Sequence, residues 1–425
     1  MRLITRLSLP VLAVMALTVP AATRPSAEAQ RFWPEWRGPL GTGEAPQATP
    51  PREWSTTKNV AWKVQVPGIG KSSPIVWGDL VIVTTAVPKD ATAAPELEWT
   101  VLAYGRADGA VKWRRVVRTG RPHEGHHQDG TFASGSALTD GTRVYVFLGS
   151  RGLYALDMKG AVVWQKDLGT MRTRNGFGEG SSATVYGDTL VLTWDHEDAD
   201  FVAAFDAATG KERWRQSRDE PTTWATPHVV VHEGKPQVVV NGTNRLVSYD
   251  LATGAPVWQT AGTTLNVIPS PVSGNGMVYA MAGFRGNSLK AIKLAEAKGE
   301  LAGTPAVAFT YDRDTPYVPS PLLYQGGLYF LKSNSGILTQ LDAGSGAVRF
   351  MQRLDATPNV YASPVAAAGL VYIVGREGTT VVIEAGPAFK LVATNVLDEP
   401  IDTSPALVGS EIYIRGTKHL YRISS

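Results

Sequence analysis

Cysteine is absent from all 425 residues of the chain. Its absence excludes disulfide bonds, a metal site built on thiolates and the lipid-modified cysteine that anchors a lipoprotein. The fold must therefore be held together by packing and hydrogen bonds.

Long apolar runs are scarce, and the longest lies near the start of the chain. Arg2 and Arg6 flank its beginning, apolar residues dominate from Leu7 to Val19, and the segment ends in Ala27-Glu28-Ala29, an A-x-A cleavage pattern. This order predicts a signal peptide over residues 1–29, which is too short to span a bilayer stably. We therefore expect a periplasmic or secreted protein without a membrane span, released by cleavage near Ala29.

The chain has no excess of one charge that would mark a surface for polyanions. Lys and Arg number 41 against 38 Asp and Glu, and the basic residues are scattered among acids. The electrostatic footprint of a nucleic-acid-binding protein is therefore missing. The motifs G-x-S-x-G and H-E-x-x-H, a phosphate-binding glycine loop and a dinucleotide fingerprint are missing too, so hydrolase and kinase functions have no support.

The chain does contain an internal repeat with a period of roughly 40 to 50 residues, the spacing of propeller blades. In the clear copies, an alternating strand ends at a turn that Asp caps and Gly completes with a positive φ. An aromatic residue then opens the outer strand, and we expect it to pack between blades. The copies are AAFDAATGKERW (203–214), VSYDLATGAPVW (247–258) and TQLDAGSGAVRF (339–350), with looser ones at LAYGRADGAVKW (102–113) and YALDMKGAVVW (154–164).

Eight short starts, each with a small hydroxyl residue, precede these units. Small residues suit innermost strands that crowd around a central channel, and Pro is tolerated at a strand's first position. Each start leads through short strands into the turn and the outer strand, which predicts four strands in a blade. The starts are Ser73-Pro74, Ser136-Ala137, Ser182-Ala183, Thr226-Pro227, Ser270-Pro271, Ser320-Pro321, Ser363-Pro364 and Ser404-Pro405.

The eighth unit is incomplete, and the beginning of the chain supplies its missing strand. Residues 403–425 end after three strands, whereas residues 59–66 read as an outer strand with Trp62 in the aromatic position. Pairing the two segments would close the ring and remove free sheet edges. The sequence thus predicts an all-β fold: a single eight-bladed β-propeller of four-stranded antiparallel blades over residues 59–425, preceded by an irregular strap over residues 30–58.

Three features together resemble the pyrroloquinoline-quinone-like (PQQ-like) repeat family. They are the D-x-x-x-G-x-x-x-W phrase, the Ser-Pro starts and the opening WPEWRGP from Trp33 to Pro39. The likeness covers essentially the whole chain after the expected signal peptide and is greatest to exported bacterial propellers. It implies either of two roles, that of the non-catalytic outer-membrane assembly scaffold BamB or that of the quinoprotein alcohol dehydrogenases. Because one fold hosts both roles, the site residues must distinguish them.

The dehydrogenase role implies a quinone stacked on a Trp beside a calcium ion that an acid and an Asn hold. Asp195 or Glu197 falls where that acid would lie, and Trp224 and Asn244 fall where the Trp and the Asn would lie. Carboxylate and amide oxygens suit calcium. The chain departs from these enzymes in lacking their adjacent-cysteine disulfide, in having no evident Asp as general base after Trp258 and in being shorter. The same residue types also serve in turns and in blade packing.

The densest polar cluster lies in residues 121–132, RPHEGHHQDGTF, between the first two blades. His123, His126, His127 and Asp129, together with Glu124, carry atoms that bind zinc, copper or iron. This cluster is therefore a candidate metal site. The alternative is a solvated loop whose polar groups bond to one another and to water.

Residues just ahead of the blade starts should surround one mouth of the central channel. Aromatic and charged side chains together in a concave mouth suit the binding of a ligand or peptide, and packing at strand ends is the alternative. The channel-mouth candidates are Lys71, Phe132, Glu179, Trp224, Tyr317, Tyr361 and Asp402.

Two functions follow from these observations. The first is a non-enzymatic, exported propeller that acts as a protein- or ligand-binding scaffold in the cell envelope, with no firm cofactor and an unidentified partner. The alternative is a quinoprotein-like oxidoreductase of alcohols or sugars that uses pyrroloquinoline quinone and calcium. Complete repeats combined with an incomplete set of catalytic residues favour the first. Because a closed ring hides its own sheet edges, we expect a monomer.

Overall fold

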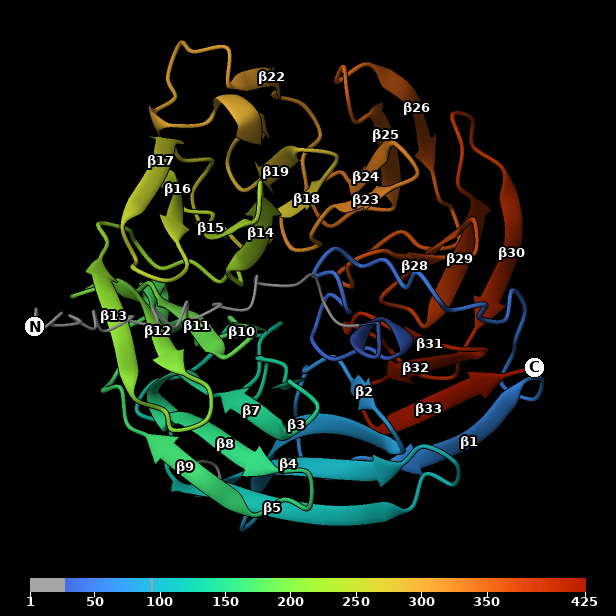
Figure 1. The fold of residues 1–425 in the computed structure, drawn as a ribbon. Helices are drawn as coiled ribbons and strands as arrows, with labels where there is room; N and C mark the ends of the chain where they lie inside the picture. The colour runs from blue at the N-terminus through green and yellow to red at the C-terminus, as the bar shows by residue number, and fades with distance from the viewer. Residues whose placement is uncertain (1–26, 93–94) are drawn as a thin grey trace, which may run out of the picture.

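The computed structural model describes residues 27–92 and 95–425, and most of the ordered structure within them is β-sheet. Eight sheets surround a common axis like the blades of a propeller (Figure 1), which confirms the predicted fold class. Residues 1–26, most of the expected signal peptide, lie outside the described residues. Within the described part of the chain, no helix has the length and apolar character needed to cross a membrane. The 3-10 turns are η1 (Ala29–Arg31), η2 (Gly149–Arg151), η3 (Arg174–Gly176) and η4 (Leu294–Glu296).

The strands of each blade follow the chain outward from the axis and pair in antiparallel fashion. The first blade contains β2 (Ile75–Trp77), β3 (Leu80–Pro88), β4 (Leu97–Gly105) and β5 (Val111–Gly120). The second contains β6 (Leu138–Thr139), β7 (Arg143–Phe147), β8 (Leu153–Asp157) and β9 (Val162–Lys166). The third contains β10 (Thr184–Tyr186), β11 (Thr189–Trp194), β12 (Phe201–Asp206) and β13 (Glu212–Ser217). The fourth contains β14 (His228–His232), β15 (Lys235–Val240), β16 (Arg245–Asp250) and β17 (Pro256–Ala261).

The remaining blades repeat this order. The fifth contains β18 (Val272–Gly274), β19 (Met277–Ala282), β20 (Ser288–Lys293) and β22 (Val307–Tyr311). The sixth contains β23 (Leu322–Tyr324), β24 (Gly327–Leu331), β25 (Ile337–Asp342) and β26 (Val348–Arg353). The seventh contains β27 (Val365–Ala367), β28 (Leu370–Val374), β29 (Thr379–Glu384) and β30 (Leu391–Val396). The eighth contains β31 (Ala406–Val408), β32 (Glu411–Arg415) and β33 (His419–Ser424), completed by β1 (Val60–Gln65).

The two ends of the chain close the ring within the eighth blade. Strand β1 pairs antiparallel with β33, with Val64 opposite Leu420, and the amide of Val66 donates to the carbonyl of Lys418 at 2.8 Å. Trp62 connects this strand to the first blade, because its Nε1–H donates to the carbonyl of Arg106 at 3.1 Å. The closure by an N-terminal strand is therefore confirmed.

The hydroxyl residues of the eight starts form a continuous ring of hydrogen bonds around the channel. At each start, the backbone N–H donates to the side-chain hydroxyl of the corresponding residue in the next blade, at 2.9 to 3.1 Å. The last bond, from Ser404 N–H to Ser73 Oγ, closes the ring at 3.0 Å. The residues that take part, here called the hydroxyl ring, are Ser73, Ser136, Ser182, Thr226, Ser270, Ser320, Ser363 and Ser404.

Outer-strand tryptophans join neighbouring blades, as the repeat predicts. Trp164 donates its Nε1–H to the carbonyl of Ala207 at 3.1 Å, and Trp214 donates to that of Leu251 at 2.8 Å, each in the turn of the next blade. The glycine of that turn lies on the ring: a Cβ added to Gly210 would lie 2.7 Å from the Trp164 side chain. Gly210 also has a φ of +71°, so both its conformation and its contact require glycine.

The fourth blade differs from the four-stranded pattern. Strand β21 (Gly299–Glu300) adds to it as a fifth strand, parallel to β17, with Trp258 opposite Gly299. The insertion that carries η4 and β21 replaces the usual turn of the fifth blade. Trp258 consequently donates to Gln237 Oε1 of its own blade, at 3.1 Å.

The strap crosses one end of the channel and attaches to several blades. Trp33 exchanges two backbone hydrogen bonds with Val76 of β2, and the amide of Thr139 donates to the carbonyl of Pro34 at 2.8 Å. On the far side of the ring, the amide of Ala45 donates to the carbonyl of Ala366 in β27 at 2.9 Å. The strap thereby forms a floor under the channel.

A buried arginine fixes the middle of the strap. Arg37 is 4% exposed, and its guanidinium donates to the carbonyls of Thr42 at 3.0 Å, Pro321 at 3.0 Å and Pro364 at 3.1 Å. Pro321 and Pro364 belong to two of the Ser-Pro starts, so the strap is bonded directly beside the hydroxyl ring. Burial lowers the pKa of Arg37 to about 9, which leaves it charged at neutral pH.

Two titratable side chains, Glu35 of the strap and His228 of β14, lie together where the strap passes the fourth blade. Burial raises the pKa of Glu35 to about 7, against a hydrogen bond from Thr184 Oγ1 at 3.0 Å. Burial, reinforced by the charge of Arg37, lowers the pKa of His228 to about 4. Both face Gly41, where an added Cβ would lie 3.0 Å from His228 Nδ1 and 3.3 Å from Glu35 Oε1.

We expect these two groups to give opposite pH slopes that offset each other in the wild-type protein. A carboxyl whose pKa is raised on folding destabilises the fold as pH increases from 4.5 to about 7. A histidine whose pKa is lowered destabilises it as pH decreases from 6.5 to about 4. In Glu35→Gln only the histidine slope remains, so the free energy of unfolding should fall between pH 6.5 and 4, by about 3 kcal/mol at most.

His228→Asn should show the reverse slope, with stability falling as pH increases from 4.5 to 7. Urea denaturation at half-unit pH intervals measures both slopes. Identical pH profiles for wild type and both variants would contradict the assignment of these groups.

Candidate functional site

A cavity of about 220 Å³ occupies the channel between its mouth and the strap. Its wall includes five members of the hydroxyl ring, and its floor is the Trp36 side chain of the strap. The cavity is consequently open at one end and closed at the other. The channel-mouth candidates that line it are Lys71, Glu179, Trp224, Tyr317, Tyr361 and Asp402, together with His127 and Asp129.

Phe132 is the one channel-mouth candidate that does not line this cavity. It lines a smaller cavity of about 30 Å³ beside it, and its ring meets His126 edge-on at 4.5 Å between centroids. Its backbone carbonyl accepts a hydrogen bond from Trp99 Nε1 at 2.7 Å. In the structure Phe132 therefore packs the loop of residues 121–132 against the first blade.

Four charged groups form a closed network on one side of the cavity. Lys71 Nζ lies 2.6 Å from Asp402 Oδ2 and donates to the Asp129 carbonyl at 2.8 Å. Arg376 joins both acids, with Nε 3.0 Å from Asp402 Oδ1 and Nη2 bonded to the Asp129 carboxylate. Two cations thus face two anions. Burial opposes ionisation of Asp129, but the bonds and charge of Arg376 prevail and lower its pKa.

Arg376 is the member of this network that sequence reasoning missed. It lies just after β28, in a loop between the second and third strands of the seventh blade, whereas the channel-mouth candidates lie in segments ahead of the blade starts. Its place in the repeat could have indicated it, because Asp195 and Glu197 follow the second strand of the third blade in the same way.

Aromatic side chains form the other surfaces of the cavity. Tyr361 donates to Asp129 Oδ2 at 3.1 Å and lies beneath the Arg376 guanidinium, 4.3 Å from ring centroid to Cζ. Tyr317 stacks on Phe284 at 4.8 Å between centroids. Trp224 is held by a hydrogen bond from Nε1 to the carbonyl of Gly178 at 2.7 Å. These rings are fixed by bonds and stacking, so they present rigid faces to the cavity.

The residues that the quinone role would use do not gather around Trp224. Asp195 is buried in a bidentate ion pair with Arg218, with N···O distances of 2.7 and 3.2 Å. It also accepts a hydrogen bond from Thr223 Oγ1 at 2.7 Å. Neither Asp195, Glu197 nor Asn244 is among the described residues that line the cavity.

Glu197 and Asn244 are likewise bonded to the segment between β13 and β14. The Glu197 carboxylate accepts from the amide and hydroxyl of Thr222 at 3.0 and 2.8 Å, and Asn244 Nδ2 donates to the carbonyl of Asp219 at 2.5 Å. Calcium needs several oxygens converging on one point. The side chains present therefore do not fit a calcium ion and quinone beside Trp224.

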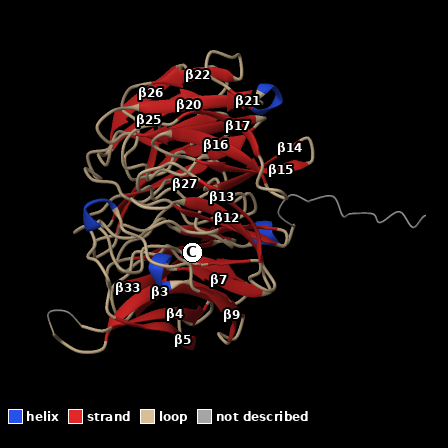
Figure 2. Cartoon of the chain, turned by 90° about the vertical axis from the view of Figure 1, so that its left-hand side faces the viewer, coloured by secondary structure: helices blue, strands red, loops and turns tan. Residues whose placement is uncertain are grey.

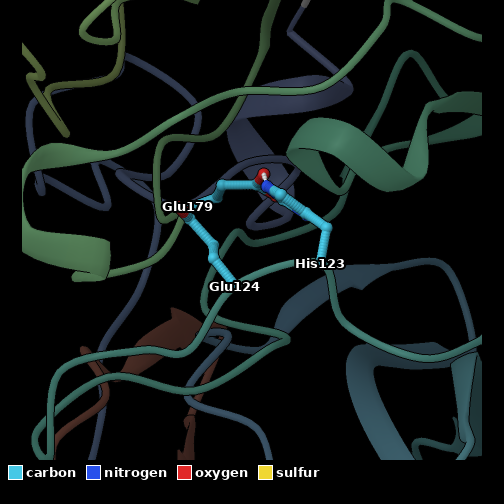
Figure 3. Close-up of side chains that lie close together, drawn as sticks. All are labelled: His123, Glu124 and Glu179. Atoms are coloured by element: carbon cyan, nitrogen blue, oxygen red, sulfur yellow. Dashed lines mark ion pairs between the residues drawn. The ribbon is translucent and has the colours of Figure 1, made fainter.

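The candidate metal cluster is divided by the structure. His123 approaches Glu124 and Glu179, with one ligand atom from each lying within 4.8 Å of the others (Figure 3). His126 Nδ1 instead lies 2.7 Å from the carbonyl of His127, and His127 packs edge-on against Phe177. Asp129 belongs to the charged network of the cavity.

The three grouped side chains already bind protein partners. His123 Nε2 lies 2.6 Å from the carbonyl of Met171, and its Nδ1 lies 2.9 Å from Arg151 Nη1. This arrangement requires the proton on Nε2 and uses both ring nitrogens. Glu124 accepts from Thr173 Oγ1 at 2.6 Å, and Glu179 from the amide of Ser150 at 3.0 Å. A metal ion would have to displace these bonds and approach the Arg151 cation.

Fold and site together place the chain among propellers of the PQQ-like type, with a cavity closed by an N-terminal strap. A family model described as outer membrane protein assembly factor BamB matches residues 53–196 and 198–425, so the chain belongs to this family. No relative among curated proteins matches it in sequence.

Solved structures show the same fold. BamB from Moraxella catarrhalis is 15% identical with a TM-score of 0.58, covering 86% of this chain and 98% of its own. The quinohemoprotein alcohol dehydrogenase from Comamonas testosteroni is 12% identical with a TM-score of 0.63, covering 95% of this chain and 81% of its own. The alcohol dehydrogenase ADHIIG from Pseudomonas putida HK5 is 14% identical with a TM-score of 0.60, covering 93% and 80%. At such identities the likeness shows the fold alone.

Arg376→Gln should destabilise the protein by about 1–2 kcal/mol, because the Asp129 carboxylate would lose its ion pair with Arg376 and Asp402 would keep only Lys71. In wild type the lowered pKa of Asp129 contributes stability above pH 3.8 that is lost as pH falls through the lowered value. The variant should lose less stability on acidification. Arg353→Gln, at an exposed position of β26, is the matched control and should change stability by less than about 0.5 kcal/mol. Urea denaturation at pH 7 and pH 3 measures the free energy of unfolding of wild type and both variants. Equal destabilisation by Arg376→Gln and Arg353→Gln would refute the network.

Proposed function

We propose that this protein is a non-enzymatic, exported propeller that binds a ligand or a protein segment at the mouth of its channel. The observation that carries the proposal is the charged network of the cavity. Lys71, Arg376, Asp129 and Asp402 neutralise one another, and no set of metal or quinone ligands converges on Trp224 within the described residues. A site built in this way offers recognition without reactive groups.

The chemistry of the cavity indicates what it would bind. Rigid faces of Trp224, Tyr317 and Tyr361 suit an apolar or ring-shaped surface, and the ring hydroxyls and the charged pairs suit polar groups at its edge. Because the floor at Trp36 closes the channel, a guest must enter and leave by the mouth.

The cell envelope is the proposed location. The signal-peptide pattern of residues 1–29 supports export, and the lack of cysteine removes the lipid attachment that would retain the chain on a membrane. Membership of the BamB family supports a role in binding proteins rather than in catalysis.

The alternative is a PQQ- and calcium-dependent oxidoreductase of alcohols or sugars, which the fold likeness to quinohemoprotein alcohol dehydrogenases favours. Titration of the purified protein with PQQ and calcium chloride separates the two. We expect unchanged quinone absorbance and a melting temperature within 1 °C of a control with calcium alone, since a ligand at 100 times its Kd would add about 2.7 kcal/mol. Quinone binding that Trp224→Ala abolishes, with oxidation of ethanol or glucose, would overturn the scaffold proposal.

A further inference from the structure

A second, larger hollow lies on the opposite side of the strap from the channel-mouth cavity. It has a volume of about 1070 Å³ and lies between the strap and the inner strands of the third to sixth blades, β10, β14, β18 and β23. We call it the strap groove. The β14–β15 hairpin, whose residues 228–232 line it, projects from the edge of the molecule (Figure 2).

The inner strands around the strap groove have edges that lack backbone partners. In the first, second and seventh blades the strap itself is the backbone partner of the inner strand. The bonded pairs are Trp33 with Val76, Pro34 with Thr139 and Ala45 with Ala366. Among the described residues, β10, β14, β18 and β23 have backbone hydrogen bonds only on the side of their own blades. Such edges are templates for an added extended segment.

The charge of the strap groove has one sign. Glu35, Glu44 and Asp140 line it, and no Lys or Arg does among the residues that the structure describes, although basic residues outnumber acidic ones in the chain, 41 to 38. Burial raises the pKa of Glu35 to about 7 and also raises that of Glu44, and a cation bound beside either carboxyl would favour its charged form. His228 and His232 are the other titratable groups of the lining besides tyrosines.

Aromatic and apolar side chains occupy the rest of the lining. Trp77, Tyr186 and Tyr324 come from the inner strands of three blades, and Leu40 of the strap lies opposite them. Aromatic faces attract cations as well as apolar groups. The groove therefore combines unpaired strand edges, acids and aromatic surfaces.

From this combination we propose that the strap groove binds an extended, basic peptide segment of a partner protein. The segment adds to a free inner strand as the strap does in neighbouring blades, and its Lys or Arg side chains meet Glu44 and Glu35. A peptide fits better than a small amine because the groove runs past four inner-strand edges, whose backbone groups only another extended chain can pair. The proposal does not depend on what the channel-mouth cavity binds.

The test uses two labelled ten-residue peptides and the purified protein. One peptide alternates lysine with valine, and its match carries glutamate in place of every lysine. Fluorescence anisotropy should show the basic peptide binding at least tenfold more tightly than the acidic one, with affinity that falls as salt increases. Equal affinities, or no binding of the basic peptide, would overturn the proposal.

Charge variants locate the binding. Glu44→Lys should weaken binding of the basic peptide about tenfold, a change of about 1.4 kcal/mol. Gln325→Lys at the exposed rim should also weaken its binding. Glu53→Lys is the matched control, because Glu53 lies on the same strap but pairs with Lys58 outside the groove, and it should leave affinity unchanged. Melting temperatures show that each variant is folded; folded charge variants that all bind like wild type would refute the site.

Other occupants give distinguishable results. Spermidine binding as tightly as the basic peptide would assign the groove to a small amine. A dimer, seen by sedimentation and dissociated by the basic peptide, would assign it to a second copy of this chain. A photo-crosslink from a benzophenone on the peptide to β10, β14 or β23 would support the proposal, and a crosslink to the channel mouth would overturn it.

Discussion

The architecture depends on the hydroxyl ring. Eight backbone amides each donate to a hydroxyl of the next blade at 2.9 to 3.1 Å, so every innermost strand begins at a fixed height and distance from its neighbours. The bonds satisfy amides that would otherwise be buried without a partner, a loss of about 1–3 kcal/mol each. Residues one or two positions ahead of the ring, such as Tyr361 and Asp402, are thereby brought to one mouth of the channel. On the other side, Arg37 bonds the strap to Pro321 and Pro364, immediately after two ring members.

The fold could be predicted almost entirely from the sequence because its signals are local and repeated. Each Asp-to-Trp phrase encodes its own turn, and Gly210 beneath Trp164 shows that the same spacing also encodes contact with the next blade. The incomplete eighth unit and Trp62 indicated the closure. The extra strand β21 could not be foreseen, since a two-residue pairing inside an insertion leaves no periodic signal. The route of the strap was hidden for a related reason: it has no repeat of its own, and many of its bonds are to backbone groups that any sequence provides.

The site was predictable only where the ring positions it. Six of the seven channel-mouth candidates line the cavity because each precedes a ring member by only two or three residues. Phe132 and the histidines around it belong to a longer loop, in which sequence spacing does not specify which side chains contact each other. His123 bonds Met171 and Arg151 instead of grouping with His126 and His127. Asp195 has the residue type of a calcium ligand, but the buried Arg218 beside it takes both carboxylate oxygens. A partner 23 residues away in sequence cannot be assigned without the fold.

The strap separates two spaces of different character, a channel-mouth cavity above Trp36 that holds a network of paired charges and an acidic groove beside Glu35. Both exist because the ring holds the inner strands in place, so the rigidity of the ring is the central claim. Hydrogen–deuterium exchange with electron-transfer fragmentation can report the eight ring amides one by one. If the ring is continuous, all eight should exchange at one slow rate, that of global unfolding, including Ser404 and Ser73 where the chain ends meet. Exchange at that junction faster by orders of magnitude than at Ser270 or Ser320 would contradict a closed ring.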